Sequence, residues 1–347
     1  MPDHPVILRL NARTFPVHPI EKEILDPLHV QWIEIEGDND DEILGSGRHA
    51  DAVMIVSAYL HGPVISRMEN LKVIARLGTG VDKIDIDEAT RQGILVTNSP
   101  DFSTDEVADH TMALLLASAR KLKHHERLCR MGKRPASVEG MRRLSTQTLG
   151  IVGFGRIGHA VARRAAAFGM RILVHDPYLD SRALLESGIE PADFDTILEQ
   201  SDFLAFLCPL TPKTREMIAI EQLQKMKPTV TIINTGRGEL FREKDVAEAL
   251  KNGRIQAAGI DVYGGINVFQ EEGFSTEHPY FSMQDNMILT PHVAANSEES
   301  LIHAKRDAAE SVRDVLSGIS PKHIVNKDVI PKLPLQGHIS MTEREKW

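Results

Sequence analysis

Three polar residues in the second half of the chain each directly follow an apolar, strand-like run. They are Arg237 after Ile232–Gly236, Asp261 after a run that ends at Ile260, and His292 after Leu289-Thr-Pro. A guanidinium fork can hold a carboxylate, and an imidazole can exchange a proton near neutral pH. The carboxyl ends of parallel strands meet at one edge of a sheet, so we expect these side chains to lie close together.

Each of the three residues also has a simpler interpretation. Arg237 could form a surface ion pair, Asp261 could shape a turn, and His292 could be an ordinary loop histidine. Any one of them alone would favour that interpretation. All three follow strand-like runs, and a glycine-rich dinucleotide-binding pattern precedes them in the chain, so their combination predicts an active site.

A glycine-rich turn further upstream indicates what else binds at this edge. Gly153-Phe-Gly155-Arg-Ile-Gly158 separates a strand-like run from the helix-patterned residues 159–168, and the next strand ends at Asp176. This succession is the dinucleotide-binding fingerprint. The first glycine permits a tight turn, the second lets backbone amides approach a pyrophosphate, and the third lets the helix pack closely on the strand. The sequence therefore predicts nucleotide binding rather than an ordinary strand–helix turn.

The elements that must position these residues alternate between strand-like and helix-like segments along the whole chain. This alternation predicts parallel sheets covered by helices. Long amphipathic helices are expected over residues 104–130 and 297–317. We expect a discontinuous substrate domain (1–100 and 296–330), a nucleotide domain (101–295) and a C-terminal tail (331–347). The ligand would lie at the carboxyl ends of the strands.

Length and composition agree with two soluble domains. The chain has 347 residues, with 42% hydrophobic and 26% charged residues. Its 40 basic and 49 acidic residues give a net charge of −9, which disfavours a nucleic-acid surface despite the basic residues within 127–134. No apolar stretch approaches the roughly 20 residues that span a bilayer, so no membrane partner is expected.

The two cysteines and the N-terminal sequence bear on the cellular compartment. Cys208 follows an apolar run and is expected to be a small core residue, and nothing near Cys129 indicates a metal or a redox partner, so no metal site is expected. The first residues lack the pattern of a secretory signal peptide. Together these features favour a reducing, cytoplasmic location.

Taken together, the motifs resemble the D-isomer-specific 2-hydroxyacid dehydrogenases over about residues 50–326. Residues 76–85 resemble the family's substrate-carboxylate loop, and Val107-Ala-Asp109-His-Thr resembles its VAEH helix with Asp109 in place of the usual glutamate. Residues 208–214 match its PLT segment. Residues 234–238 and 290–292 match its arginine and histidine motifs.

The resemblance implies a fold and a reaction. The fold is α/β, with two doubly wound parallel-sheet domains and a Rossmann nucleotide domain inserted in a flavodoxin-like discontinuous substrate domain. The reaction is hydride transfer between NADH and a small 2-oxo acid, or its reverse from the 2-hydroxy acid, in a homodimer. His292 would exchange the proton. Arg237 would hold the substrate carboxylate together with backbone amides near Thr79 and Gly80.

The same resemblance assigns the residues that line NAD. Asp176 would accept hydrogen bonds from the adenosine ribose hydroxyls, which favours NAD over NADP. The full expected set is Gly153, Gly155, Arg156, Ile157, Gly158, Asp176, Thr235, Asp261 and Ala295, with Thr104 and Pro209 as additions.

One departure from the family pattern concerns the acid that pairs with the histidine. Counting forward from Asp261, the position of the family glutamate holds Ile266. Counting back from His292, residues 268–273 fit the family pattern VFxxEP and place Glu272 at the glutamate. We interpret residues 264–269 as a short insertion, so that Glu272 is the functional acid. In the competing interpretation the glutamate is lost, and Glu271 and Glu272 belong to a solvated loop.

A second function of a different class fits the same fold. The chain could be an NAD(H)-sensing binding protein, like the transcriptional corepressors that resemble these enzymes. The altered glutamate region is consistent with that hypothesis, whereas Arg237 and His292 favour the enzyme.

Overall fold

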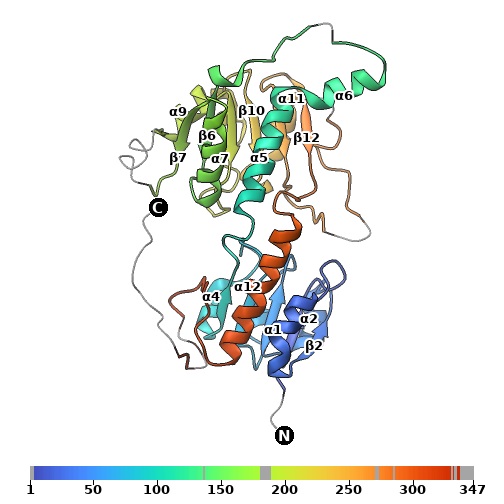
Figure 1. Cartoon of the computed structure of the whole chain (residues 1–347), viewed down its shortest axis with the longest axis vertical. Coiled ribbons are helices and arrows are strands. Elements are labelled where there is room, and N and C mark those ends of the chain that lie inside the picture. Colours follow the sequence, from blue (N-terminus) through green and yellow to red (C-terminus); the bar gives the residue numbers. More distant parts are fainter. Residues whose placement is uncertain are drawn as a thin grey trace. The chain divides into compact units, whose positions relative to one another are not determined.

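The chain folds into two compact units, each with its own parallel sheet (Figure 1). The computed structural model describes residues 4–135, 137–179, 189–269, 273–283, 286–329, 331 and 334–336. The first unit comprises Met1–Phe102, Phe269–Glu271 and Ser297–Trp347, and the second comprises Ser103–Val268 and Glu272–Asn296. The predicted fold class, two doubly wound α/β domains, is confirmed.

The first unit contains a five-stranded sheet whose strands are all parallel, in the order β2-β1-β3-β4-β5. This is the flavodoxin-like order. The strands are β1 (Val6–Arg9), β2 (Gln31–Glu34), β3 (Ala52–Ile55), β4 (Val73–Arg76) and β5 (Leu95–Thr97). The helices are α1 (Pro19–Leu25), α2 (Asp40–Gly47), α3 (Gly62–Ile65), α4 (Ile86–Arg91) and α12 (Glu298–Leu316).

Helix α12 explains why this unit is discontinuous in sequence. It lies beside α1 and packs on β4 (Figure 1). Ala308, Val312 and Val315 are fully or almost fully buried there, in one apolar cluster with Ile7 and Met54 of the sheet. One face of the sheet therefore depends on residues that come about 200 positions later in the chain than β5.

The second unit contains a seven-stranded parallel sheet in the order β12-β11-β10-β9-β6-β7-β8. The chain starts at β6 in the interior of the sheet, adds two strands on one side and then four on the other, which is the Rossmann order with one extra strand. The strands are β6 (Thr148–Val152), β7 (Arg171–His175), β8 (Glu190–Pro191), β9 (Phe203–Phe206), β10 (Thr231–Asn234), β11 (Ala257–Ile260) and β12 (Met287–Leu289). The helices are α5 (Thr104–Ala119), α6 (Leu122–Arg130), α7 (Arg156–Ala167), α9 (Phe194–Gln200), α10 (Ile220–Lys225) and α11 (Glu243–Lys251).

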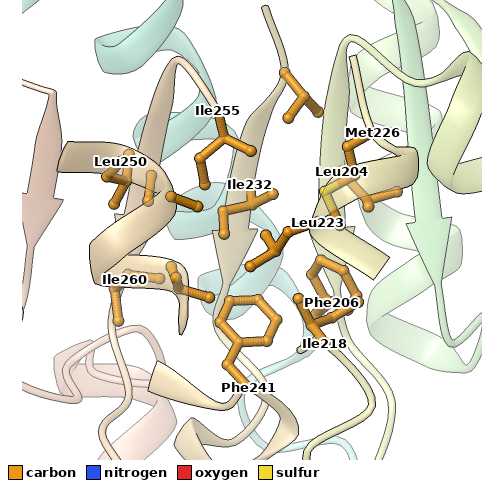
Figure 2. Close-up of a cluster of buried hydrophobic side chains, with 14 of the residues drawn as sticks. Leu204, Phe206, Ile218, Leu223, Met226, Ile232, Phe241, Leu250, Ile255 and Ile260 are labelled. Carbon is orange, nitrogen blue, oxygen red and sulfur yellow. The ribbon is translucent and has the colours of Figure 1, made fainter. Parts of the chain in front are cut away.

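Both faces of this sheet are covered. On one face, Leu223 of α10 and Leu250 of α11 pack with Leu204, Ile232 and other strand residues (Figure 2). On the other face, α5 and α7 pack against β6 and its neighbours. Burial on both faces explains why strands such as Phe203–Phe206 are apolar at every position rather than at alternate ones.

The helix predicted over residues 104–130 is two helices, so this prediction was wrong. Helix α5 ends at Ala119, and Lys121 adopts the left-handed conformation (φ 49°) before α6 begins at Leu122. No residue of α6 is buried, whereas α5 buries one face along its whole length. The sequence has no glycine or proline at this break to signal it. Among the described residues, no helix has the length and apolar character needed to cross a membrane.

Helix α5 packs directly against β11 at Gly259, which has no side chain to keep the two elements apart. A Cβ atom at Gly259 would lie 2.9 Å from Cβ of Leu114 on α5. The close approach brings the polar residues His110 and Thr111 of the same helix within reach of the strand ends.

We expect Gly259→Ala to destabilise the protein by about 1–3 kcal/mol, because the added methyl group would overpack the contact between α5 and β11. The free energy of unfolding from urea titrations followed by circular dichroism measures this effect. Gly45→Ala is the control, since a Cβ atom there meets nothing within 4 Å. In a helix this control should stabilise the protein by about 0.4–1 kcal/mol. A Gly259→Ala variant as stable as the wild type would show that the contact relaxes freely.

Candidate active site

The glycine turn after β6 has the conformation that the fingerprint requires. Gly153 has a φ of 91°, and a Cβ atom there would lie 2.5 Å from the backbone nitrogen of Cys208. A Cβ atom at Gly158 would lie 2.6 Å from the carbonyl oxygen of Gly153. These two positions therefore need glycine for the turn itself and for the close packing of α7.

The middle glycine differs, since nothing lies within 4 Å of the position that a Cβ atom on Gly155 would occupy. Helix α7 begins at the next residue, with no side-chain cap and no acidic residue in its first turn. The first amides of a helix lack partners within the helix, and its N-terminus carries partial positive charge. The open space at Gly155 therefore fits a phosphate group.

Asp176 lies beside this turn, directly after β7. Its Oδ2 accepts a hydrogen bond from the backbone N–H of Phe154 at 2.8 Å, and its Oδ1 accepts one from Tyr178 N–H at 3.0 Å. A carboxylate has room for about four hydrogen bonds, so two acceptor positions remain. The structure thus places the carboxylate next to the phosphate-type site, as a ribose-binding acid would require.

Arg237 is presented by a tight turn after β10. The buried Asn234 side chain holds this turn from both sides: its Nδ2 donates to Arg237 O at 2.8 Å, and its Oδ1 accepts from Gly236 N–H at 3.0 Å. Arg237 is half-buried, and its guanidinium Nη1 donates to Gly236 O at 2.7 Å.

The turn at Arg237 lies directly against the loop that follows β11. A Cβ atom at Gly238 would lie 2.2 Å from the backbone nitrogen of Gly264, so only glycine fits this contact. Asp261 begins that loop and donates its backbone N–H to Asn234 O at 3.0 Å. The loops after β10 and β11 therefore form one packed surface.

Asp261 is fully buried and holds the next turn in place. Its Oδ1 accepts hydrogen bonds from the Thr290 hydroxyl at 2.6 Å and Val293 N–H at 3.0 Å, and its Oδ2 accepts one from Ala294 N–H at 3.0 Å. Burial raises the pKa of Asp261 above its ordinary value, and these hydrogen bonds and the nearby imidazole of His110 oppose that rise only in part. These contacts agree with the alternative interpretation, in which Asp261 shapes a turn. The contact of Asp261 with NAD stays a prediction.

His292 lies in the middle of that turn in a left-handed conformation, with a φ of 55°. Its backbone N–H donates to Asp261 O at 2.8 Å and to Thr290 O at 3.0 Å. Left-handed backbone is uncommon for a residue other than glycine, and such outliers concentrate at functional sites. The turn continues to Ala295, which was predicted to line NAD.

Further hydrogen bonds, which the sequence did not predict, stabilise the loop after β11. The Tyr263 hydroxyl donates to Thr290 O at 2.9 Å, and the partly buried residues His278 and Glu243 pair through their side chains at 2.7 Å. Glu243 also accepts from Gly264 N–H at 3.0 Å. The motif His278-Pro-Tyr-Phe is visible in the sequence, but no sequence signal links it to Glu243.

The remaining predicted site residues are spread over both units. Thr79 and Gly80 follow β4 in the first unit, where the Thr79 hydroxyl donates to Ser99 O at 3.0 Å. Thr104 is the first residue of α5, and Pro209 follows β9 with its carbonyl accepting from the Thr214 hydroxyl at 2.7 Å. Glu272 lies outside the described residues.

The neighbours of two further predicted residues are defined. Thr235 is buried, and its hydroxyl lies 2.8 Å from that of Thr111. Ile157 and Arg156 belong to the first turn of α7, next to the open space at Gly155. Asp109, which replaces the usual family glutamate, pairs with Arg164 of α7 at 2.6 Å rather than with a site residue.

Comparison with known proteins identifies this arrangement. The family model described as D-isomer specific 2-hydroxyacid dehydrogenase, NAD binding domain, matches residues 112–294. A D-3-phosphoglycerate dehydrogenase from Methanocaldococcus jannaschii is 38% identical over 89% of this chain and 60% of its own length. A glyoxylate reductase from Korarchaeum cryptofilum is 37% identical over 81% of this chain and 84% of its own length.

Comparison of the fold with solved structures points to the same family. A D-lactate dehydrogenase from Aquifex aeolicus, solved with NAD and lactic acid, superimposes with a TM-score of 0.81 and 29% identity, covering 90% of this chain and 96% of the other. The chain spans about 60% of the length of the phosphoglycerate dehydrogenase relatives that it matches. It belongs to the D-isomer specific 2-hydroxyacid dehydrogenase family, whose NAD-binding domain its second unit carries.

Proposed function

We propose that this protein is an NAD-dependent D-2-hydroxyacid dehydrogenase that reduces a small 2-oxo acid and oxidises the corresponding 2-hydroxy acid. The observation that carries the proposal is the shared edge of the nucleotide sheet. Arg237 and His292 lie there on turns that are held by the buried side chains of Asn234 and Asp261. A cation for a carboxylate and a proton donor are the groups that this reaction needs beside a dinucleotide.

In the proposed mechanism, bound NADH supplies the hydride that is transferred to the carbonyl carbon. Arg237 binds the substrate carboxylate and polarises the neighbouring carbonyl. The imidazolium of His292 gives its proton to the carbonyl oxygen as negative charge develops there, so that the products are the 2-hydroxy acid and NAD⁺. In the oxidative direction His292 accepts the proton. Glu272, placed by the sequence pattern, would favour the protonated form of His292.

The first turn of α7 would hold the pyrophosphate, and Asp176 would hold the adenosine ribose. We retain Arg156, Ile157, Thr235, Asp261 and Ala295 as proposed neighbours of NAD, together with Thr104 and Pro209. Thr79 and Gly80 are proposed to contribute backbone amides to the substrate carboxylate.

The names of the relatives support the substrate class. D-3-phosphoglycerate dehydrogenase, glyoxylate reductase and D-lactate dehydrogenase all handle acids with a carboxylate next to the reacting carbon. They give no support to the alternative, an NAD(H)-sensing binding protein. We also propose a homodimer, as the family resemblance implies. A cytoplasmic location is proposed because Cys129 and Cys208 are both free thiols.

The cofactor should be NADH rather than NADPH, because the Asp176 carboxylate would face the 2′-phosphate of NADPH. A like-charge contact costs several kcal/mol, so kcat/KM for NADH should exceed that for NADPH by about a hundredfold or more. Asp176→Asn removes the negative charge, so it should reduce the ratio of kcat/KM for NADH to kcat/KM for NADPH. Equal use of both cofactors by the wild-type protein would refute this assignment.

The activity itself is tested by following NADH oxidation with glyoxylate, pyruvate and hydroxypyruvate. The wild-type protein should turn over at least one of them. His292→Asn should then lower kcat by about two to four orders of magnitude, since a general acid contributes that much, and should leave NADH affinity nearly unchanged. Binding of NADH without turnover of any 2-oxo acid would favour the sensor alternative.

Arg237→Lys separates charge from geometry at the carboxylate site. Lysine keeps the positive charge but lacks the planar fork, so we expect kcat/KM for the 2-oxo acid to fall about tenfold or more. The dissociation constant of NADH serves as the control and should change little. If the lysine variant kept the wild-type kcat/KM, Arg237 would not be the carboxylate ligand.

A further inference from the structure

Two successive polar residues of α5 reach the strand ends that carry the proposed active site. His110 Nε2 lies 2.9 Å from the Thr290 hydroxyl, after β12, and the Thr111 hydroxyl lies 2.8 Å from the Thr235 hydroxyl, after β10. Helix α5 thus contacts both the turn that holds His292 and the turn that holds Arg237. Neither His110 nor Thr111 has a role in the function proposed above.

The directions of the hydrogen bonds follow from how many protons are available. The Thr290 hydroxyl has one proton and donates it to Asp261 Oδ1 at 2.6 Å. It must therefore accept from His110, whose Nε2 carries a proton. In the same way, Thr111 donates to Val107 O at 2.7 Å and accepts from Thr235. His110, Thr290 and Asp261 form a directed chain that ends on the buried carboxylate.

Asp261 needs this chain because a carboxylate without access to water must be compensated by donors. The side chain of Asp261 is 0% exposed, and its donors are the Thr290 hydroxyl and the amides of Val293 and Ala294. His110 adds an imidazole whose Nε2 lies 3.6 Å from Asp261 Oδ1. The two amides belong to the residues directly after His292, so the position of Asp261 determines the position of the His292 turn.

We propose that His110 is a positioning residue for the reaction proposed above. Through Thr290 it holds the Asp261 carboxylate in place, and Asp261 in turn keeps His292 in the left-handed conformation that presents its imidazole. The inference rests on the proposed function as far as catalysis is concerned. The positioning of the turn itself depends only on the hydrogen bonds described.

His110→Leu and His110→Gln test the kinetic consequence. Leucine removes the donor, so kcat for the 2-oxo acid should fall about ten- to a hundredfold, as expected when a catalytic group is slightly misplaced. KM for NADH should change less than kcat, because the proposed pyrophosphate and ribose sites at α7 and Asp176 do not involve His110. The glutamine amide nitrogen can take the place of Nε2 and donate to Thr290, so His110→Gln should recover most of kcat. Asp109→Asn is the matched control on the same helix, because its Arg164 partner lies outside the site; it should leave kcat unchanged.

A double-mutant cycle with Thr290→Val tests whether His110 acts through that hydroxyl. Each single variant breaks the same series of hydrogen bonds from His110 through Thr290 to Asp261. The fall in kcat in the double variant His110→Leu/Thr290→Val should therefore be no larger than the fall in the more impaired single variant. Additive losses would show that His110 acts by another route. An unchanged kcat in His110→Leu, or an equal loss in His110→Gln, would overturn the proposal.

Hydrogen exchange of the Val293 and Ala294 amides provides a test that needs no activity. In folded His110→Leu these amides should exchange about tenfold faster or more, because their acceptor is less firmly held. Exchange in Asp109→Asn should match the wild type. Unchanged exchange in His110→Leu would overturn the inference even if the protein is a dehydrogenase. If the wild type binds NADH but reduces no 2-oxo acid, the proposed function fails, while this measurement still decides whether His110 holds the turn.

Discussion

The buried carboxylate of Asp261 is the interaction on which the geometry of the candidate site depends. Placing an ionised group where water cannot reach it is costly unless donors surround it. Here the donors are a hydroxyl and two amides from the turn that carries His292. The hydrogen bonds that compensate the charge of Asp261 thus hold the turn after β12 in one conformation, in which His292 has a φ of 55°.

Close packing allows this compensation. The strands of the second unit are buried on both faces, and glycine is placed where two elements must touch. Gly259 lets α5 approach β11, and Gly238 lets the Arg237 turn lie against the loop at Gly264. The proposed catalytic side chains therefore lie on turns whose backbones are braced by neighbours, although the turns themselves are not part of any strand or helix.

Local patterns in the sequence were sufficient to predict the architecture. The alternation of strands and helices, the turn at Gly153 and the acid at Asp176 are each encoded within a few residues, and the structure has each of them. The break at Lys121 was not predicted, because a lysine in the left-handed conformation leaves no compositional signal. The contacts of His110 with Thr290 and of Glu243 with His278 were also missed, since each joins residues that only the folded sheet brings together. Asp261 shows most clearly what the sequence could not predict. Its position at the end of a strand was predicted, but the number and direction of the hydrogen bonds that it accepts were not.

The late position of α12 has a consequence for the order in which the units can fold during synthesis. The apolar face of the first sheet is covered by Ala308, Val312 and Val315, which are translated after the entire nucleotide sheet. At roughly 5–20 residues per second, the chain from the end of β12 at Leu289 to the end of α12 at Leu316 takes about one to five seconds to synthesise. Although the first unit contains the N-terminus, the second unit can therefore finish its core earlier on the ribosome. Until α12 emerges, this apolar face of the nascent first sheet is covered only in part, by residues such as Leu25 of α1, and this is the stage at which a chaperone would be most useful.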